Sequence, residues 1–372
     1  MKTKRILSLA LALILCLSFF AACGEKAPAS TPAPADKPAE TPADKPAETP
    51  AEPAGPVDAS KDPVVNLICA HEMNVNSGHG AGYVEFGEYL TEVSGGSITM
   101  EHHGSRAICD QSTFIDAALS GVCHYGHNTA TYLTSVIPQV ACLSIPGYFS
   151  GTEEEWLEFA AAIHEPMTEL LAQYDLKYMG ADYPGVAALY GTGDPITSPD
   201  VCKGKVIRSA GEYLSKSIEA WGAAATTIPM PDIASSIERG TVDACYTMYA
   251  MLNDQGFKDL VDWAVYTTNQ ETFSAMIMPM DTYDDMTDAQ KAIIDEAAKI
   301  YPEMSMDDYD YASLVQGVKD TGVNVVELTD EESAAFTEAT RPLFEEFGKN
   351  TDEYGLALLK VIYDFNGWEW TF

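Results

Sequence analysis

The chain has 372 residues, 46% of them hydrophobic, and a formal net charge of −35 at pH 7. Nearly all of this negative charge lies from Lys61 onward. Because so acidic a body repels phosphates, nucleic acid is excluded as a partner, and other anions would be repelled at long range. The body contains only four arginines, Arg106, Arg208, Arg239 and Arg341. An acidic ligand would therefore need a short, bidentate contact with one guanidinium.

The N-terminus has the pattern of a bacterial lipoprotein signal. Three basic residues among the first five form an n-region, residues 6–20 form an apolar h-region, and a cleavage site ends in Cys23. We therefore expect a signal peptide at 1–22 and lipidation of Cys23, although an ordinary secretory signal with an incidental cysteine would also fit. No later run has the roughly 20 apolar residues of a membrane span, so that lipid is the expected anchor.

The segment 23–60 is predicted to be a disordered tether. It consists mainly of Pro, Ala, Thr, Glu and Lys, and the octapeptide ADKPAETP occurs at 35–42 and again at 43–50. Such a composition lacks the apolar surface that would offset the entropy of ordering, and its prolines favour extended conformations.

Just over 300 residues follow the tether without an internal repeat, which is enough for two α/β lobes. In the first part, short apolar strands alternate with helices in the order βαβαβ. Connections this short predict the first half of a doubly wound lobe. The predicted elements are a strand at 64–71, a helix from Ser77 to Gly95, a strand at 97–103, a helix around 114–119 and a strand at 122–127.

The alternation continues through the rest of the body. A capping box at Thr152–Glu155 begins a helix to about Tyr174, and Thr329 begins another helix. A helix-forming run at 287–319 is expected to break near Pro302. Strands are predicted at 177–182 and 186–190, which cross into a second lobe, at 243–247, at 263–268 and 272–279, which return toward the first lobe, and at 323–328.

The stretch 203–243 has the pattern strand, helix, strand, helix. Its first strand ends at Arg208, its first helix stops at Gly222, and Pro231 begins the second helix. In open α/β sheets, ligands are held at the carboxyl ends of strands. Arg208 is therefore the first candidate for contact with an anionic ligand.

This stretch resembles the solute-binding receptors of TRAP transporters, the tripartite ATP-independent periplasmic uptake systems, in their dicarboxylate-receptor (DctP-type) family. Related fragments extend the resemblance over about 64–358. Five fragments in order carry it within the stretch: Lys-Gly at 203–204, Lys-Val-Ile-Arg at 205–208, Trp-Gly-Ala at 221–223, Ile-Pro-Met at 228–230 and Arg-Gly-Thr-Val-Asp at 239–243.

The resemblance implies an α/β fold with two lobes, of the periplasmic-binding-protein type II kind. Each lobe is expected to be a mainly parallel sheet flanked by helices, with a long helix in the C-terminal half. The first lobe is predicted at 62–184 plus 275–318, and the second at 185–274 plus 319–372.

The function implied by the resemblance is capture of a small organic acid between the lobes and its delivery to a membrane permease, made of a large and a small integral subunit. The mature protein is expected outside the cytoplasm, anchored to the membrane by lipid. No enzyme motif, such as GxSxG, SxxK or a phosphate loop, is present. We therefore expect neither catalysis nor a cofactor.

Arg208 matches the family arginine that forms a salt bridge with the substrate carboxylate. The chain departs from the family in two places: it lacks a base after Tyr190, and Tyr246 and Thr247 stand where many members have asparagine. Polar contacts are predicted from the first lobe and aromatic walls near the second, although core packing would also explain each aromatic ring. The remaining predicted ligand contacts are Arg106, His71, Glu72, Asn128, Tyr213 and Phe273.

A rival interpretation is a metal-binding lipoprotein that uses histidines of the first lobe. Four of these histidines close predicted strands and, with Cys69 and Glu72, could meet around a metal such as zinc. The sequence contains no HExxH or HxH spacing that would support a metal site. The preferred prediction, a solute receptor, therefore includes no metal site. The six cysteines of the body lack CxxC spacing and are expected to be mostly unpaired, buried thiols. The four histidines are His71, His102, His103 and His127.

Overall fold

The computed structural model describes residues 57–76, 78–183, 185–270, 272–306 and 311–372. The predicted signal peptide, the lipidation site Cys23 and the tether up to residue 56 lie outside the described residues. Ala59, which the sequence assigns to the tether, is buried in the core of the folded body.

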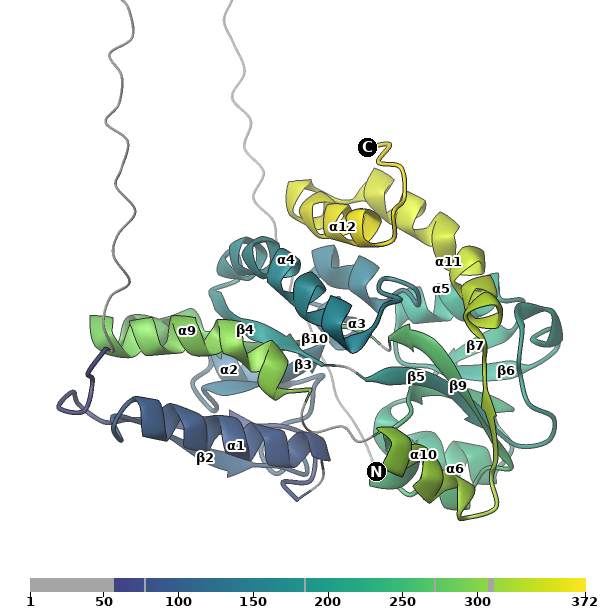
Figure 1. The fold of residues 1–372 in the computed structure, drawn as a ribbon, viewed down its shortest axis with the longest axis horizontal. Coiled ribbons are helices and arrows are strands. Elements are labelled where there is room, and N and C mark those ends of the chain that lie inside the picture. The colour runs from purple at the N-terminus through teal and green to yellow at the C-terminus, as the bar shows by residue number, and fades with distance from the viewer. Residues whose placement is uncertain (1–56, 77, 184, 271, 307–310) are drawn as a thin grey trace, which may run out of the picture. The chain divides into compact units, whose positions relative to one another are not determined.

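The first of two sheets has five strands in the order β2-β1-β3-β10-β4 (Figure 1). β1 pairs in parallel with β2 and β3, whereas β10 is antiparallel to both β3 and β4. The strands are β1 (Val65–Ala70), β2 (Ile98–His103), β3 (Tyr125–Thr129), β4 (Leu176–Asp182) and β10 (Ser274–Pro279).

Helices cover this sheet because their apolar faces need a buried partner. α1 (Gly78–Val93) packs against β2, and both α4 (Glu153–Ala172) and α9 (Asp288–Met304) pack against β4. α12 (Glu353–Phe365) packs on α4. The shorter elements are α2 (Phe114–Leu119), α3 (Ala130–Leu133), the 3-10 helix η1 (Pro138–Ser144) and α8 (Met280–Asp284).

The second sheet has six strands in the order β11-β9-β5-β8-β6-β7. Its parallel pairs are β11–β9, β6–β7 and β6–β8, and β5 is antiparallel to β8 and β9. The strands are β5 (Val186–Gly191), β6 (Val206–Ser209), β7 (Ala224–Thr227), β8 (Ala244–Met248), β9 (Trp263–Gln270) and β11 (Asn324–Glu327).

The helices of the second lobe pack around its sheet for the same reason, since their apolar faces also need a buried partner. α5 packs against β7 and α11 against β9, while α10 contacts α7 and β11. These elements are η2 (Pro199–Val201), α5 (Glu212–Ala220), η3 (Met230–Asp232), α6 (Ile233–Glu238), α7 (Met251–Asp254), η4 (Phe257–Asp259), α10 (Tyr311–Lys319) and α11 (Asp330–Asn350).

Two strand connections join the sheets. The chain leaves the first sheet at Asp182 and enters the second at Val186, then leaves the second at Gln270 and re-enters the first at Ser274. Ser274 pairs with Asp182 in the register of β10 with β4. The first connection therefore leaves the first sheet next to the point where the second connection returns to it, at one edge of the cleft between the lobes. Paired connections of this kind act as hinges in domain closure.

The two-lobed α/β fold predicted from the sequence is confirmed, and the strand pairings are mixed, five parallel and four antiparallel. The capping boxes at Thr152 and Thr329 are present. The helix-forming run at 287–319 breaks close to Pro302, as expected: α9 contains this proline and ends two residues later at Met304, and α10 begins at Tyr311.

The lobe boundaries stay a prediction, and two elements bear on them. Most of α10 lies in the segment 275–318, which was predicted to belong to the first lobe. It packs, however, against α7 and against β11 of the second sheet. α12 was grouped with the second lobe but packs on α4 and η1. Within the described ranges, no helix combines the length and hydropathy needed to cross a bilayer.

Candidate functional site

Two small cavities lie between the lobes, with volumes of about 30 and 100 Å³. They share the lining residues Glu72, Gln111, Tyr132 and Met230, so they are parts of one cleft. The smaller cavity is also lined by Met73, His127, Thr129, Thr131, Arg208, Ala210, Thr247, Met248, Met251 and Thr272, and the larger by Arg106, Asp110, Ser112, Pro229 and Pro231.

Arg208 projects into this cleft from the carboxyl end of β6, as the sequence predicted for a strand-end arginine. Its side chain is 1% exposed. The Nε atom donates a hydrogen bond to the Ile228 carbonyl at 2.8 Å, but the NH2 group is buried without a partner. Among the described residues, no carboxylate lies within ion-pair distance of Arg208. A buried guanidinium in this state can take up an anion, since an unpaired buried charge is costly and a carboxylate would neutralise it.

Gln111 organises the first-lobe side of the cleft. Its Nε2 donates to Glu72 Oε1 at 2.6 Å, and its Oε1 accepts from the Thr129 backbone amide at 2.8 Å. Its own carbonyl accepts from Asn128 Nδ2 at 2.8 Å. Burial raises the pKa of Glu72, while the Gln111 hydrogen bond and the positive charges of Arg106 and Arg208 oppose that shift. The first lobe thus presents an acceptor held in place opposite the guanidinium.

The loop after β2 brings Arg106 to the same cleft. Ser105 and Arg106 both have positive φ, 56° and 61°, which is uncommon for residues other than glycine. The loop is held by backbone hydrogen bonds from Ser105 to Met73 and from Arg106 to His71, at 2.8 and 3.2 Å. Strained backbone of this kind clusters at functional sites.

The predicted contacts fall into two groups in the structure. Arg208, Arg106, Glu72 and Thr247 line the cleft cavities. The others line neither cavity, and their ligand contacts stay predictions. They are His71, Asn128, Tyr213, Tyr246 and Phe273.

The three aromatic residues of this second group pack against other rings. Phe273 lies within 6.5 Å of Tyr148, Trp156 and Phe159, between ring centroids. Tyr246 packs on Trp221 at 5.3 Å and Tyr213 on Phe347 at 6.1 Å. Their positions agree with the alternative interpretation, that these rings pack in the core and do not form walls of the ligand site.

Several cleft residues were missed by the sequence reasoning. Thr129 lies on β3, at its carboxyl end, so the strand-end rule that selected Arg208 would also have selected it. The same rule did single out His127 on β3, but only as a member of the metal-binding alternative and not as a predicted solute contact. Met230 lies within the Ile-Pro-Met fragment that follows β7. No sequence signal marked Gln111, which lies in an irregular loop and whose role depends on three tertiary hydrogen bonds.

A buried polar cluster lies beside the cleft, next to the interlobe connections. Asp182 is 1% exposed and accepts hydrogen bonds from Tyr301 and Tyr83 at 2.9 and 3.1 Å. His127 Nε2 lies 3.6 Å from Asp182 and 3.2 Å from the Ser274 hydroxyl. Burial raises the pKa of Asp182 to about 7 and lowers the pKa of His127 to about 3. His127 therefore connects the cleft wall to the point where the chain changes lobes.

A larger hollow, of about 610 Å³, lies elsewhere, among the start of α4, α11 and the C-terminal tail. Its lining includes Glu155, Asp330 and Glu338 but no arginine or lysine. Such a surface repels anions, so the smaller interlobe cavities are the better candidate for binding a carboxylate despite their size.

The model of the family described as bacterial extracellular solute-binding protein, family 7 (DctP), matches residues 69–350. The ectoine-binding periplasmic protein TeaA of Halomonas elongata is 22% identical over 283 residues, which are 74% of this chain and 82% of TeaA.

Solved structures give the same picture for the fold. A TRAP periplasmic solute-binding protein of Chromohalobacter salexigens, with bound D-glucuronate, has a TM-score of 0.73 at 18% identity, covering 80% of this chain and 99% of that one. One from Sulfurospirillum deleyianum, with bound succinate, has a TM-score of 0.69 at 17% identity, covering 80% and 97%.

Proposed function

Because the chain belongs to the bacterial extracellular solute-binding proteins of family 7, we propose that it captures a small organic acid between its lobes and delivers it to the integral membrane subunits of a TRAP transporter. The family consists of substrate-binding receptors, and this chain shares their two-lobed fold.

The observation that carries the proposal is the buried, unpaired NH2 group of Arg208. A carboxylate in the adjoining cavity would accept from this group and neutralise the guanidinium. Because the Nε atom is already bonded to Ile228, the contact with the carboxylate runs through the terminal nitrogens. Water-excluded charge pairs of this kind are strong, since each partner left alone would be a buried unpaired charge.

The opposite wall adds a second requirement for the solute. Glu72 is held by Gln111 and offers an acceptor in both cavities of the cleft. A solute that carries a hydroxyl or ammonium donor at some distance from its carboxylate would satisfy both walls. The cavities, about 30 and 100 Å³, are small by the standard of ligand sites, which supports a compact solute and requires the lobes to part for its entry.

The test is a calorimetric titration of the protein with succinate, D-glucuronate and ectoine, the ligands of the relatives above and of TeaA. We expect at least one of these or a related acid to bind, and Arg208→Gln to abolish the heat. Arg239→Gln is the matched control, because Arg239 is exposed and bonds only to Ser235 of its own helix within the described chain. Binding that survives Arg208→Gln would contradict the proposed site.

We also propose that Cys23 carries the lipid that holds the receptor at the outer face of the membrane. The positive n-region, apolar h-region and cysteine at the cleavage site support this. Cells expressing the full chain should incorporate labelled fatty acid into the protein, and Cys23→Ser should release it from the membrane fraction. A Cys23→Ser protein that stays in the membrane fraction would count against lipid anchoring.

A further inference from the structure

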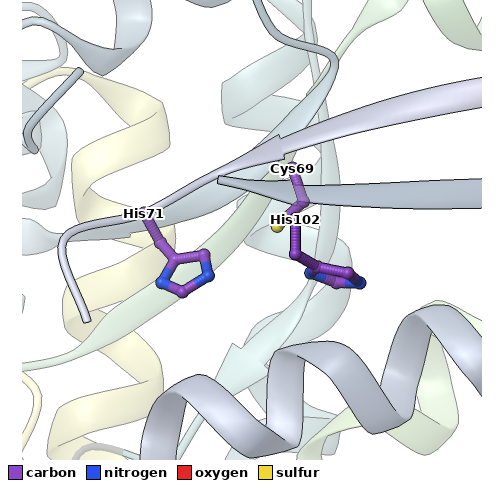
Figure 2. Close-up of side chains that lie close together, drawn as sticks. All are labelled: Cys69, His71 and His102. Carbon is purple, nitrogen blue, oxygen red and sulfur yellow. The ribbon is translucent and has the colours of Figure 1, made fainter. Parts of the chain in front are cut away.

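A second potential ligand site lies in the first lobe, in the layer between the sheet and α1. Cys69 lies on β1, His71 directly follows that strand, and His102 lies on β2 as the register partner of Cys69. Residues two apart on a strand share a face, and so do register partners in a parallel pair. Figure 2 shows the three side chains on the same side of the two strands.

The three side chains are close enough to share one ion. Each offers one ligand atom, and these atoms all lie within 4.8 Å of one another. Zinc bonds of about 2.0–2.3 Å bring neighbouring ligand atoms to roughly 3.3–3.8 Å, so the side chains would need to close by about 1 Å. Rotation of the imidazoles about χ1 and χ2 can supply such a movement.

The helix α1 is shaped around these imidazoles. The His71 ring packs edge-on against Tyr83, with 4.8 Å between ring centroids. A Cβ atom on Gly87 would lie 2.6 Å from His102 Nε2, so the absence of a side chain at Gly87 makes the room that His102 occupies. The site is therefore built by packing as well as by strand register.

The ring nitrogens of these imidazoles are poorly satisfied in this part of the described structure. His71 is 3% exposed, and neither of its ring nitrogens makes a hydrogen bond of good geometry, although the Met73 backbone lies near the ring. The Nδ1 atom of His102 is likewise buried and unpartnered. Buried polar atoms are normally satisfied, and each exception calls for an explanation.

We propose that Cys69, His71 and His102 bind a thiophilic metal ion, with Zn²⁺ as the reference case. One thiolate and two imidazoles suit zinc or copper and not Mg²⁺ or Ca²⁺, which require oxygen ligands. Three protein ligands leave a fourth position open for water. His102 is only half-buried, which provides a route for the ion. Binding displaces the Cys69 proton to solvent, so no oxidant or reductant is involved.

The proposed ion would lie next to the segments that supply the solute cleft. Glu72 directly follows His71, and the His71 carbonyl accepts from the Arg106 amide at 3.2 Å. An ion at this place would tie β1 and β2 together just before both loops enter the cleft. The site is distinct from Arg208, because neither of the cleft cavities is lined by Cys69, His71 or His102.

The test is a titration of the chelator-treated protein with Co²⁺, followed by displacement with Zn²⁺. We expect one equivalent of Co²⁺ to bind and to produce the near-ultraviolet charge-transfer absorption of a cobalt–thiolate bond, which Zn²⁺ abolishes. Zn²⁺ should also raise the melting temperature by several degrees.

Cys69→Ser and His102→Gln should each lose the cobalt–thiolate band. Cys202→Ser, which alters a buried thiol of the second lobe, and His103→Gln, which alters the neighbouring half-buried histidine, should keep it. Arg208→Gln should also keep it, so failure of the metal site and failure of the carboxylate site are separable. Weak binding of several equivalents without the thiolate band, or a band that persists in His102→Gln, would overturn the proposal. His102→Gln keeps the test decisive if Cys69→Ser does not fold.

Discussion

Two buried charged side chains, one in each lobe, differ in how far the protein satisfies them. Asp182, at the end of β4, accepts from two tyrosine hydroxyls and lies beside His127. Arg208, at the end of β6 and equally buried, donates its Nε proton to a carbonyl while its NH2 group has no partner. A buried polar group whose partners come from the protein is satisfied within the fold. One whose partners are incomplete stabilises a complex instead, because a ligand must supply what is missing.

The largest effect is expected from Arg208→Gln. Removing one partner of a buried ion pair costs roughly 3–5 kcal/mol, so affinity for the carboxylate should fall by at least about 100-fold. The stability of the ligand-free protein should be unchanged or higher, since an unpaired buried charge is removed. Calorimetry gives the affinity and urea denaturation gives the stability. If Arg208→Gln lowered the free energy of unfolding of the ligand-free protein by several kcal/mol, Arg208 would be needed for the fold, as Asp182 is. The two side chains would then no longer differ in this respect.

Asp182→Ala should show the opposite pattern. The tyrosine hydroxyls of Tyr83 and Tyr301 would lose their buried acceptor, so the free energy of unfolding should fall by about 2–4 kcal/mol. Asp295→Ala is the control, because Asp295 also accepts from a tyrosine hydroxyl, and from Lys177 at 2.6 Å, but is 45% exposed. It should cost less than about 1 kcal/mol. Equal losses in the two variants would indicate that burial of the Asp182 cluster adds nothing.

The pH dependence of stability sharpens the comparison further. The pKa values of His79 and His127 are lowered to about 3 and that of His71 to about 4, each mainly by burial. Between pH 4 and 6.5 the unfolded chain therefore binds more protons at these three histidines, and stability should fall as the pH falls.

Asp182 opposes this trend. Its pKa is raised to about 7, so between pH 4 and 7 the folded state holds the extra proton, and its contribution to stability is lost as the pH rises through that range. Near pH 5 these four groups together account for a difference of about two protons, or roughly 2.7 kcal/mol per pH unit in the metal-free protein. In denaturation curves between pH 4.5 and 6.5, His127→Gln should reduce the slope by about one proton, whereas Asp182→Asn should steepen it by about one. If neither change altered the slope of stability against pH, His127 and Asp182 would not be the source of the pH dependence.

A smaller effect is expected from Gln111→Ala. This change removes the hydrogen bonds that hold Glu72 and the Thr129 amide, but it leaves the charge of Arg208 in place. The solute affinity should fall about 10-fold, in keeping with roughly 1–1.5 kcal/mol for one or two hydrogen bonds. The control is Gln173→Ala, whose exposed side chain bonds only to the Glu169 carbonyl within the described residues. A 100-fold loss from Gln111→Ala would place the main binding contact in the first lobe.

Much of the fold could be predicted from local patterns. Each capping box, at Thr152 and Thr329, depends on residues three apart, and the apolar strand runs are legible without tertiary information. The break near Pro302 was also legible, although α9 continues for two residues past the proline. Pro302 and the preceding Ala298 and Tyr301 are buried in the core, and this packing offsets the loss of one backbone hydrogen bond.

The candidate site divides in the same way. The position of Arg208 at a strand end was readable, because strand ends face the cleft in any open α/β sheet. Tyr213 lies on α5 and Phe273 just before β10, and both pack against other rings. Tyr246 lies on β8, where side chains alternate between two faces, so that the next residue, Thr247, lines the cleft instead.

The sequence by itself determined the alternation of strands and helices, the family resemblance and the arginine at the end of β6, because each of these depends on residues close together in the chain. Only the tertiary structure decided which buried groups are satisfied. Gln111 meets Glu72 across 39 positions, and Tyr301 meets Asp182 across 119. Cys69 meets His102 only through the register of β1 with β2. Hydrogen bonds and metal ligation require distances of a few ångströms, and such distances between remote residues are set by sheet order, register and helix packing.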